Sequence, residues 1–128
     1  MCRKITEKAV NAMLCGYDFR ESNTEVRTRP HNGTVAMILH GHCIALIDGE
    51  TLHIYDHGYK TRVTYERLHE LVRRWTYGKY GVASRKGGVL IEYERNTGKI
   101  KDNREYTGRA SFQRGGYVVN LGLTYQQA

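Results

Sequence analysis

The spacing of apolar residues near the N-terminus predicts a short amphipathic helix. Apolar pairs at 9–10 and 13–14 recur at three- and four-residue intervals, which places them on one side of a helix. Thr6 is a residue type that caps helix N-termini, and Gly16 is one that ends helices. The apolar side is narrow, so we expect this helix to pack against another element.

Between residues 24 and 55 the pattern changes to alternating and β-branched segments, which predict strands. Asn32-Gly33 and Asp48-Gly49 are hairpin turn signals, and Pro30 ends the first segment. Gly41 would mark a kink or a bulge if one strand ran through it. We therefore expect a three- or four-stranded antiparallel meander, with strands at 24–29, 34–40, 42–47 and 51–55.

A second helix is predicted at about 64–77, and its pattern is the clearest in the chain. Thr64 stands where an N-cap belongs, and Gly78 lies just past the end. Arg73 and Arg74 in the last turn favour the helix dipole, which gives them a structural role beside any binding role. The apolar face of this helix carries Leu68, Leu71, Val72 and Trp75.

Beyond residue 79 the pattern returns to strands separated by glycine-containing turns. The predicted strands are 80–84, 89–94, 99–106 and 117–123, with turns at 86–88, 96–98 and 114–116. No linker divides the chain, so we expect one α+β domain with an antiparallel sheet, a short N-terminal helix and one amphipathic helix. Within it, residues 1–78 form a helix–meander–helix part and residues 79–128 form basic C-terminal hairpins.

The charge of the chain is basic and uneven. There are 20 Lys and Arg against 13 Asp and Glu, a formal net charge of +7. Residues 81–128 hold eight basic and four acidic side chains, whereas residues 31–80 hold six and five. The C-terminal cations are interleaved with aromatic residues such as Phe112, so they could neutralise phosphates beside planes for base stacking. An exposed sheet edge protected by charge would have the same composition.

Cysteine usage and hydropathy indicate a cytoplasmic protein. Cys2, Cys15 and Cys43 form no CxxC pair, and an odd count suits a reducing compartment. No apolar run approaches the ~20 residues that cross a bilayer, so no membrane partner is expected. The N-terminus lacks the apolar core of a secretion signal.

Several short motifs between residues 4 and 72 form a pattern that is typical of a protein family. They are Asn23-Thr24-Glu25-Val26, Leu39-His40-Gly41-His42-Cys43-Ile44-Ala45, Gly58-Tyr59-Lys60-Thr61 and Thr64-Tyr65-Glu66-Arg67-Leu68-His69. In this pattern the chain resembles a family of small tailed-phage proteins of unknown function. His42 stands where that family has a polar amide, Tyr59 replaces tryptophan, and His69 replaces asparagine. The resemblance implies a phage or mobile-element origin, gives no mechanism, and leaves the C-terminal hairpins outside the family-like part.

The residues that could carry catalysis do not form a recognisable active site. His40 and His42 are two apart and would share a face of one strand, with His53 or His57 as a third metal ligand. Tighter zinc motifs are missing from the sequence, so we expect no metal and no cofactor. The more ordinary interpretation is that His40 donates a structural hydrogen bond.

Nuclease and cysteine chemistry find little support. Asp56-His57 is the one local pairing of an acid with a histidine, and it lies in a turn. A ribonuclease that uses two histidines as acid and base stays open. Cys15 and Cys43 stand in apolar sequence surroundings, which raise the pKa of a thiol and leave it inert.

The leading hypothesis is a non-enzymatic phage or mobile-element protein that binds nucleic acid, RNA or DNA, or a nucleoprotein complex in the host bacterial cell, in host takeover or anti-defence. The alternatives are an anti-CRISPR-like protein inhibitor of a host defence enzyme and a histidine- or metal-dependent ribonuclease. The oligomeric state stays open, with a homodimer among the options. The candidate binding residues are Arg85, Lys86, Tyr93, Arg95, Lys99, Lys101, Arg104, Tyr106 and Arg109, and secondarily Arg67, Arg73 and Arg74.

Overall fold

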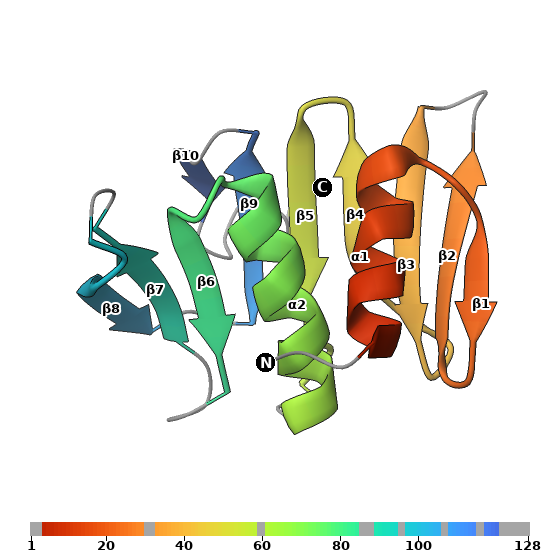
Figure 1. The fold of residues 1–128 in the computed structure, drawn as a ribbon, viewed down its shortest axis with the longest axis horizontal. Coiled ribbons are helices and arrows are strands. Elements are labelled where there is room, and N and C mark those ends of the chain that lie inside the picture. Colours follow the sequence, from red (N-terminus) through yellow and green to blue (C-terminus); the bar gives the residue numbers. More distant parts are fainter. Residues whose placement is uncertain are drawn as a thin grey trace.

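The chain folds into the expected α+β class, with its strands divided between two antiparallel sheets (Figure 1). The computed structural model describes residues 4–29, 33–58, 61–84, 89–94, 97–105, 108–114 and 117–120, the last four and residues 104–105 as backbone. The predicted turn at 86–88, parts of those at 96–98 and 114–116, Asn32, and residues 121–123 lie outside the described residues. The helices are α1 (Lys4–Cys15) and α2 (Arg62–Trp75); the strands are β1 (Phe19–Glu21), β2 (Thr24–Arg29), β3 (Thr34–Leu39), β4 (His42–Asp48), β5 (Thr51–Tyr55), β6 (Tyr80–Ala83), β7 (Val89–Tyr93), β8 (Ile100–Glu105), β9 (Arg109–Gln113) and β10 (Tyr117–Asn120).

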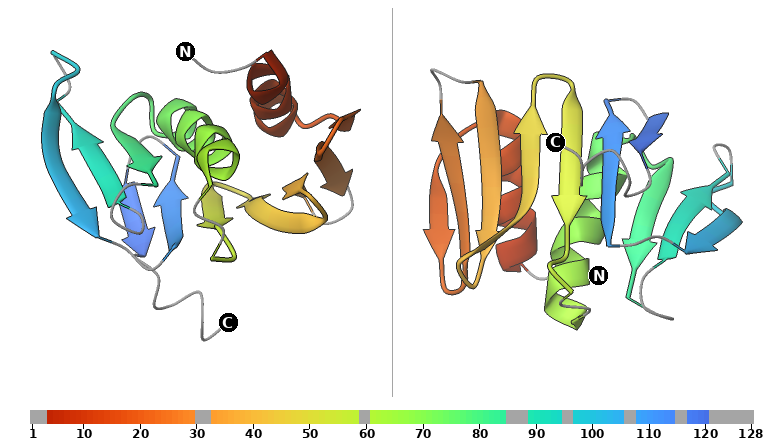
Figure 2. Two further views of the ribbon diagram at one scale, coloured as in Figure 1. Left: turned by 90° about the horizontal axis from the view of Figure 1, so that it is seen from below. Right: turned by 180° about the vertical axis from the view of Figure 1, so that it is seen from behind.

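The larger sheet has seven strands in the order β1-β2-β3-β4-β5-β9-β10, and the smaller has three in the order β6-β7-β8. Both helices cover one face of the larger sheet, as the views from the front and from below show (Figures 1 and 2). α2 lies between α1 and the smaller sheet, because it packs against α1 on one side and β6 on the other. The opposite face of the larger sheet turns away from the helices (Figure 2, right).

The predicted meander is confirmed as β2 to β5, but Gly41 has a different role from the one expected. Leu39 pairs with His42 across the β3–β4 junction, and His40 and Gly41 have φ angles of 51° and 81°. Two consecutive residues in the left-handed region form a two-residue hairpin turn. One strand therefore does not run through Gly41, and the kink or bulge expected for that case is not found at this residue. The bulge lies further along, where the β3–β4 register shifts between Met37 and Ile38.

Two strands escaped the sequence pattern. β1 has three residues, too few to show an alternating pattern, and it pairs antiparallel with β2. β9 pairs with β5, more than fifty positions earlier in the chain, through partners such as Leu52 and Phe112. That pairing adds the C-terminal strands β9 and β10 to the sheet that the meander forms.

Helix α1 begins before Thr6, so Thr6 is not its cap. The helix starts at Lys4, and Thr6 lies inside it, fully buried against α2, where its hydroxyl donates to Glu66 Oε1 at 2.7 Å. The apolar residues Ala9, Val10 and Met13 are buried beside it, as the spacing predicted.

The N-cap of α2 is Thr61 rather than Thr64. Thr61 has an extended backbone, and its Oγ1 accepts a hydrogen bond from the Thr64 backbone N–H at 3.2 Å. This is the geometry of an N-cap that satisfies the N3 amide. The helix ends at Trp75. Gly78, with a φ of 82°, closes the turn after it, and its backbone N–H donates a hydrogen bond to the Arg73 carbonyl.

The core lies between the helices and the larger sheet. From α2 it takes the four apolar residues that the periodicity selected, and Trp75 Nε1 donates to the Phe112 carbonyl of β9 at 3.1 Å. Phe112 is fully buried, so it is a core residue and not part of a stacking surface. No helix in the described part of the chain is long and apolar enough to cross a membrane.

Candidate nucleic-acid interface

The structure does not gather the predicted binding residues on one surface. Arg85, Lys86, Arg95 and Tyr106 lie outside the described residues, and of Arg104 the structure describes the backbone in β8. The others are spread over the smaller sheet, α2 and β9.

The predicted residues of the smaller sheet face mixed surroundings. Lys101 Nζ lies 3.8 Å from a carboxylate oxygen of Glu92 on the neighbouring strand. Tyr93 is partly buried, with its ring 6.5 Å from that of His69 in an edge contact. Lys99 is exposed. The described side chains of this sheet therefore do not form a continuous basic strip, because Lys101 lies near a carboxylate and Tyr93 packs against His69.

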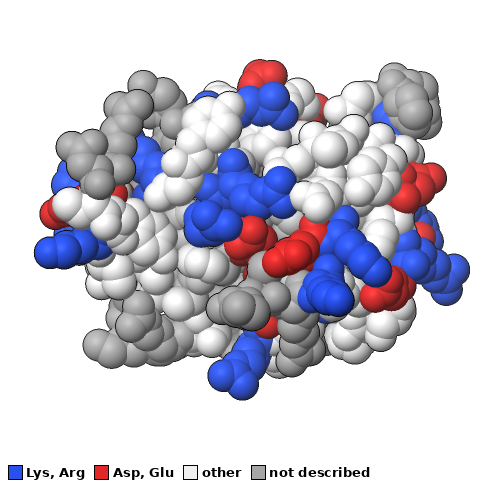
Figure 3. All heavy atoms as spheres, viewed as in Figure 1, with Lys and Arg blue, Asp and Glu red and all other residues white. Residues whose placement is uncertain are grey.

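Arg73 and Arg74 make polar contacts on the helical side of the molecule. The Arg73 guanidinium lies 2.9 Å from Glu70, and Arg74 Nη1 donates to Asn11 Oδ1 of α1 at 2.5 Å. Blue and red side chains alternate across this side of the molecule (Figure 3). The helical side is therefore a mixture of both charges, which favours solvation over the binding of a polyanion.

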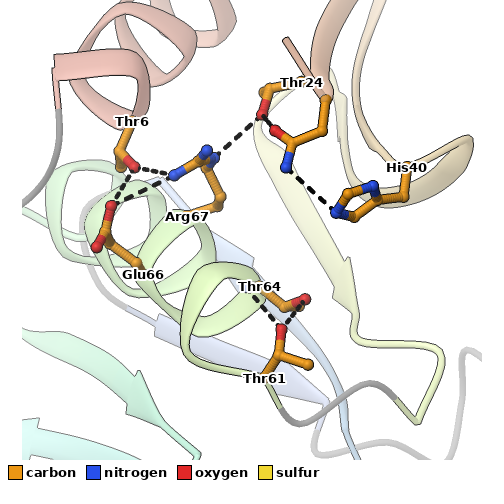
Figure 4. Close-up of polar contacts among 8 residues, drawn as sticks. Thr6, Thr24, His40, Thr61, Thr64, Glu66 and Arg67 are labelled. Atoms are coloured by element: carbon orange, nitrogen blue, oxygen red, sulfur yellow. Dashed lines mark hydrogen bonds and ion pairs between the residues drawn. The ribbon is translucent and has the colours of Figure 1, made fainter.

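Arg67 is buried inside the fold, which corrects its predicted place on a binding surface. Its side chain is 1% exposed, and its guanidinium donates to Thr24 Oγ1 of β2 at 3.2 Å and to Thr6 Oγ1 of α1 (Figure 4). Glu66, on the same helix, supplies the countercharge at 3.3 Å. A buried cation has to be paired and hydrogen-bonded in this way. Arg67 therefore joins α1, α2 and β2 and cannot reach a partner.

The same network continues to the β3–β4 turn. Thr24 Oγ1 donates to Asn23 Oδ1 at 2.9 Å, and the Asn23 amide nitrogen lies 3.2 Å from His40 Nε2 (Figure 4). An amide nitrogen only donates, so His40 accepts this bond, contrary to the expectation that it donates. Asn23, Thr24, His40 and Arg67, all members of the sequence pattern that resembled a phage family, thus meet in one hydrogen-bonded chain.

A different group of arginines shares the face of the larger sheet that the helices leave uncovered, here called the open face. In β2, Thr24 and Val26 are buried under α1, so Arg27 and Arg29 alternate to the other side. The β1–β2 register places Arg20 beside Glu25 on that same side. Residues that are paired across neighbouring strands lie on the same face, so the strand registers give the remaining members of the open face. It comprises Arg20, Glu25, Arg27, Arg29, Thr34, Ala36, Ile38, Cys43, Leu46, Asp48, Thr51, His53, Tyr55, Arg109, Ser111 and Gln113.

The open face carries more positive than negative side chains among its described residues. Its cations are Arg20, Arg27, Arg29 and Arg109, and its carboxylates are Glu25 and Asp48. Arg27 Nε donates to Glu25 at 2.6 Å, which lowers the pKa of Glu25 and raises that of Arg27. Two hollows of about 520 and 470 Å³ lie at the β1–β2 end of the sheet, and Arg20, Glu25 and Arg27 line both.

Four planar groups lie in a row that we call the planar row: Arg109 of β9, Tyr55 of β5, His57 just after β5, and His42 at the start of β4. Arg109 and Tyr55 belong to the open face, whereas His42 pairs with the buried Leu39 of β3 and so lies on the helical side of the sheet. The Arg109 guanidinium carbon is 4.0 Å from the centre of the Tyr55 ring. The Tyr55 ring centre is 4.2 Å from that of His57, and His57 is 5.2 Å from His42, each pair of rings tilted by 42°. His57 is fixed by its own hydrogen bond, because its Nε2 lies 2.7 Å from the Cys43 carbonyl and a carbonyl accepts.

The histidines that the structure describes are not arranged as a metal centre. His40 lies in the turn and His42 begins the next strand, so they do not share a face of one strand as the sequence suggested. In the described part of the chain no three His, Cys, Asp or Glu residues gather closely enough to hold a metal ion. His53 Nδ1 contacts Ser111 Oγ at 2.7 Å, and burial lowers its pKa.

The acid and thiol candidates also have structural contacts. Asp56 is buried and accepts bonds from the Tyr65 hydroxyl at 2.5 Å and the Gly58 amide at 2.8 Å, while His57 is bonded elsewhere. Cys15 and Cys43 are exposed, not in apolar surroundings as expected. Partial burial nonetheless raises the pKa of the Cys43 thiol, which donates to the Ala45 carbonyl at 3.4 Å.

Sequence reasoning missed Arg20, Arg27 and Arg29 as interface candidates. Alternation in 24–29 was a sufficient signal that Arg27 and Arg29 share one side of a strand, but not that this side faces away from both helices. The pairing of β9 with β5 brings Arg109 onto the same face.

Comparison with known proteins identifies a family. The model of a family described as Kyanoviridae Gp96 protein matches residues 2–118. This range runs well beyond residue 72 and includes β6 to β9, which the sequence pattern had left outside the family-like part. No curated protein and no solved structure matches the chain.

Proposed function

We propose that this chain, which belongs to the Kyanoviridae Gp96 family of phage proteins, is a non-enzymatic protein that binds nucleic acid through the open face of its larger sheet. The observation that carries the proposal is the arrangement of Arg20, Arg27, Arg29 and Arg109 on one face of the sheet, away from both helices. A phage origin supports an activity inside an infected host cell.

Neutralisation of phosphates by these arginines would drive the binding. Each phosphate that a cation neutralises releases counterions, so the logarithm of the binding constant falls with the logarithm of the salt concentration by about 0.7 per contact for a single strand. Four arginines in contact with phosphates would give a slope of about −3. Arginine suits this role because its planar fork donates two parallel hydrogen bonds to a phosphate.

The test is fluorescence anisotropy with labelled single-stranded RNA, single-stranded DNA and duplex DNA over a range of salt concentrations. The test variant is Arg20→Gln with Arg29→Gln, because both side chains are exposed on the open face. We expect the affinity to fall and the salt slope to decrease by about 1.4, the share of two phosphate contacts.

A matched control removes the same charge from the smaller sheet. Lys99→Gln with Lys101→Gln also changes the net charge by two, and we expect it to change binding less than the open-face pair. A larger loss in the lysine pair would move the interface to the smaller sheet, and salt-insensitive or absent binding of the wild type would refute the proposal. RNA that stays intact during the assay supports binding over the ribonuclease alternative.

A further inference from the structure

We infer that β8 is a dimerisation strand. It pairs antiparallel with β8 of a second copy of the chain, so that the two three-stranded sheets join into one. This dimer goes beyond the proposed nucleic-acid binding and does not depend on it, because β8 belongs to the smaller sheet and the open face to the larger one. Two observations support it, the edge position of β8 and the order of charges along it.

β8 lies at the outer edge of the smaller sheet (Figures 1 and 2). One side of this strand pairs with β7, and no strand in the described part of the chain pairs with the other side. Lys101, Asp102 and Asn103 are exposed, and Ile100 is an apolar side chain that is 50% exposed. The N–H and C=O groups of an edge strand can pair with a strand of another chain. The exposed residues of β8 therefore leave this edge accessible to a second copy.

The backbone of β8 has an exposed hydrogen bond that a second strand can replace. The Asn103 N–H donates to Oδ1 of its own neighbour Asp102 at 2.9 Å. Such a bond from a side chain to a nearby amide is an alternative to a bond within a sheet. In the dimer the Asn103 carbonyl of the second copy accepts this N–H instead, and the Asp102 carboxylate becomes available to a cation.

The order of charges along β8 is complementary to itself. Residues 101–105 read Lys-Asp-Asn-Arg-Glu. In a two-fold symmetric antiparallel pair one residue lies on the axis opposite its own copy, and the residues on either side of it pair in reverse order. With Asn103 on the axis, Lys101 stands opposite Glu105 of the second copy. In the same register Asp102 stands opposite Arg104, so every charged position from 101 to 105 meets the opposite charge.

Other registers centred on a residue of β8 bring like charges together. A charged residue on the axis stands opposite its own copy, which applies to centres at positions 101, 102, 104 and 105. A centre on Ile100 places Lys99 opposite Lys101. Opposite charges stabilise a pair of strands, whereas like charges directly opposite one another destabilise it. The charges of β8 therefore select the register that is centred on Asn103.

The neighbouring strand favours the same register. The β7–β8 pairing places Glu92 opposite Asp102, and Lys101 Nζ lies 3.8 Å from a Glu92 carboxylate oxygen. In the proposed dimer Arg104 of the second copy stands opposite Asp102 on its other side. This arrangement adds a second cation beside two carboxylates, which lowers the repulsion between them.

Sedimentation equilibrium of the full chain over a range of protein concentrations measures the association. Lys101→Glu places a glutamate opposite Glu105 in both symmetry-related pairs, so we expect the association constant to fall by about tenfold or more. The charge-swapped variant, Lys101→Glu with Glu105→Lys, restores opposite charges in the same register and should bring the constant back to within about threefold of the wild type. Lys99→Glu is the matched control, because it makes the same change of charge at an exposed position before β8. It should change the constant by less than about threefold.

A cross-linking experiment tests which residue lies on the axis. Asn103→Cys brings two thiols opposite one another, with the Cα atoms about 4.5–5.5 Å apart, a separation that suits a disulfide. Glutathione disulfide should therefore cross-link this variant into a dimer much faster than Lys99→Cys or the wild type, whose position 99 does not stand opposite its own copy. The urea unfolding midpoint of each variant shows that it is folded.

Three results overturn the inference. They are a wild type that sediments as a monomer at every concentration, a dimer that Lys101→Glu leaves unchanged, and a charge-swapped variant that associates no better than Lys101→Glu. None of them affects the nucleic-acid binding proposed for the open face, which is measured separately by anisotropy.

Discussion

Replacing Arg67 by methionine should destabilise the protein strongly without removing a partner contact. Methionine is unbranched and apolar, so it suits a site that is 1% exposed. The substitution removes the guanidinium that contacts Thr6, Thr24 and Glu66. Breaking a buried ion pair from one side costs about 3–5 kcal/mol, because the other charge loses its partner.

The structure places the expected cost near the lower end of that range. The Glu66 side chain is 19% exposed, so water can solvate its carboxylate after the change. Thr6 and Thr24 keep the hydrogen bonds that they donate to Glu66 and Asn23. We therefore expect a loss of about 3 kcal/mol, out of the ~5–15 kcal/mol that stabilise a typical domain. For a chain of this size that corresponds to a melting temperature lower by about 12 °C.

Urea unfolding followed by tryptophan fluorescence measures this loss, because Trp75 is 2% exposed and reports the opening of the core. Arg62→Met is the matched control, since Arg62 is exposed on the same helix and should change stability by less than about 0.5 kcal/mol. A double-mutant cycle with Thr24→Val should give a coupling of about 1–2 kcal/mol, as expected for residues in one buried network. If Arg67→Met costs no more than Arg62→Met, the structural role assigned to Arg67 is wrong.

Three further changes test the packing around α2. Gly81→Ala should cost about 1–3 kcal/mol in a thermal unfolding scan, because a Cβ there would lie 2.5 Å from the His69 ring, and an unchanged melting temperature would contradict this packing. Burial, aided by Arg73, lowers the pKa of His69, so stability should fall as the pH drops from 7 to 5, where the unfolded histidine takes up a proton near its ordinary pKa of about 6.5 and the folded one resists it. His69 Nδ1 accepts a hydrogen bond from the Val82 backbone N–H at 3.2 Å. His69→Asn, which can still accept this bond, should give a smaller difference between urea midpoints at the two pH values; an identical difference would assign the effect to other groups. Thr61→Ala should cost about 1 kcal/mol in urea unfolding and Thr61→Asn much less, because asparagine also caps helices; equal losses would argue against the cap.

The sequence pattern predicts most of the fold where neighbours in the chain determine the structure. The meander joins strands through short turns, and the apolar face of α2 has a clear helical period, so local spacing was sufficient. In β9 the apolar residues Ala110 and Phe112 alternate with the polar residues Arg109, Ser111 and Gln113. However, its partner β5 is distant in the chain, and no local signal identifies such a pairing. The cap of α2 was misplaced by one turn because two threonines stand three positions apart, and the preference for threonine at an N-cap does not choose between them.

The candidate site was harder to predict because charge counts do not distinguish exposed cations from buried ones. Arg67 and Arg74 look equivalent in the sequence, yet one is inside the fold and the other contacts α1. Arg27 and Arg29 were not predicted as binding residues, because their strand lies far in the sequence from the C-terminal excess of positive charge. Which side of a strand faces away from the helices follows from the packing of α1 and α2 on the sheet, and that packing is a property of the whole chain.

The hydrogen-bonded chain around Arg67 separates the residues that build this protein from those proposed to bind a partner. Asn23, Thr24, His40 and Arg67 belong to the sequence pattern and satisfy one another's polar groups. Their substitution should therefore act on stability, and binding should fall only with the folded fraction. The open-face arginines alternate with core residues of the same strands, so their substitution should lower binding at constant stability. Measuring both quantities for each variant distinguishes the two groups, because a residue of the first group that lowered binding while the protein stayed fully folded would have to lie at the interface itself.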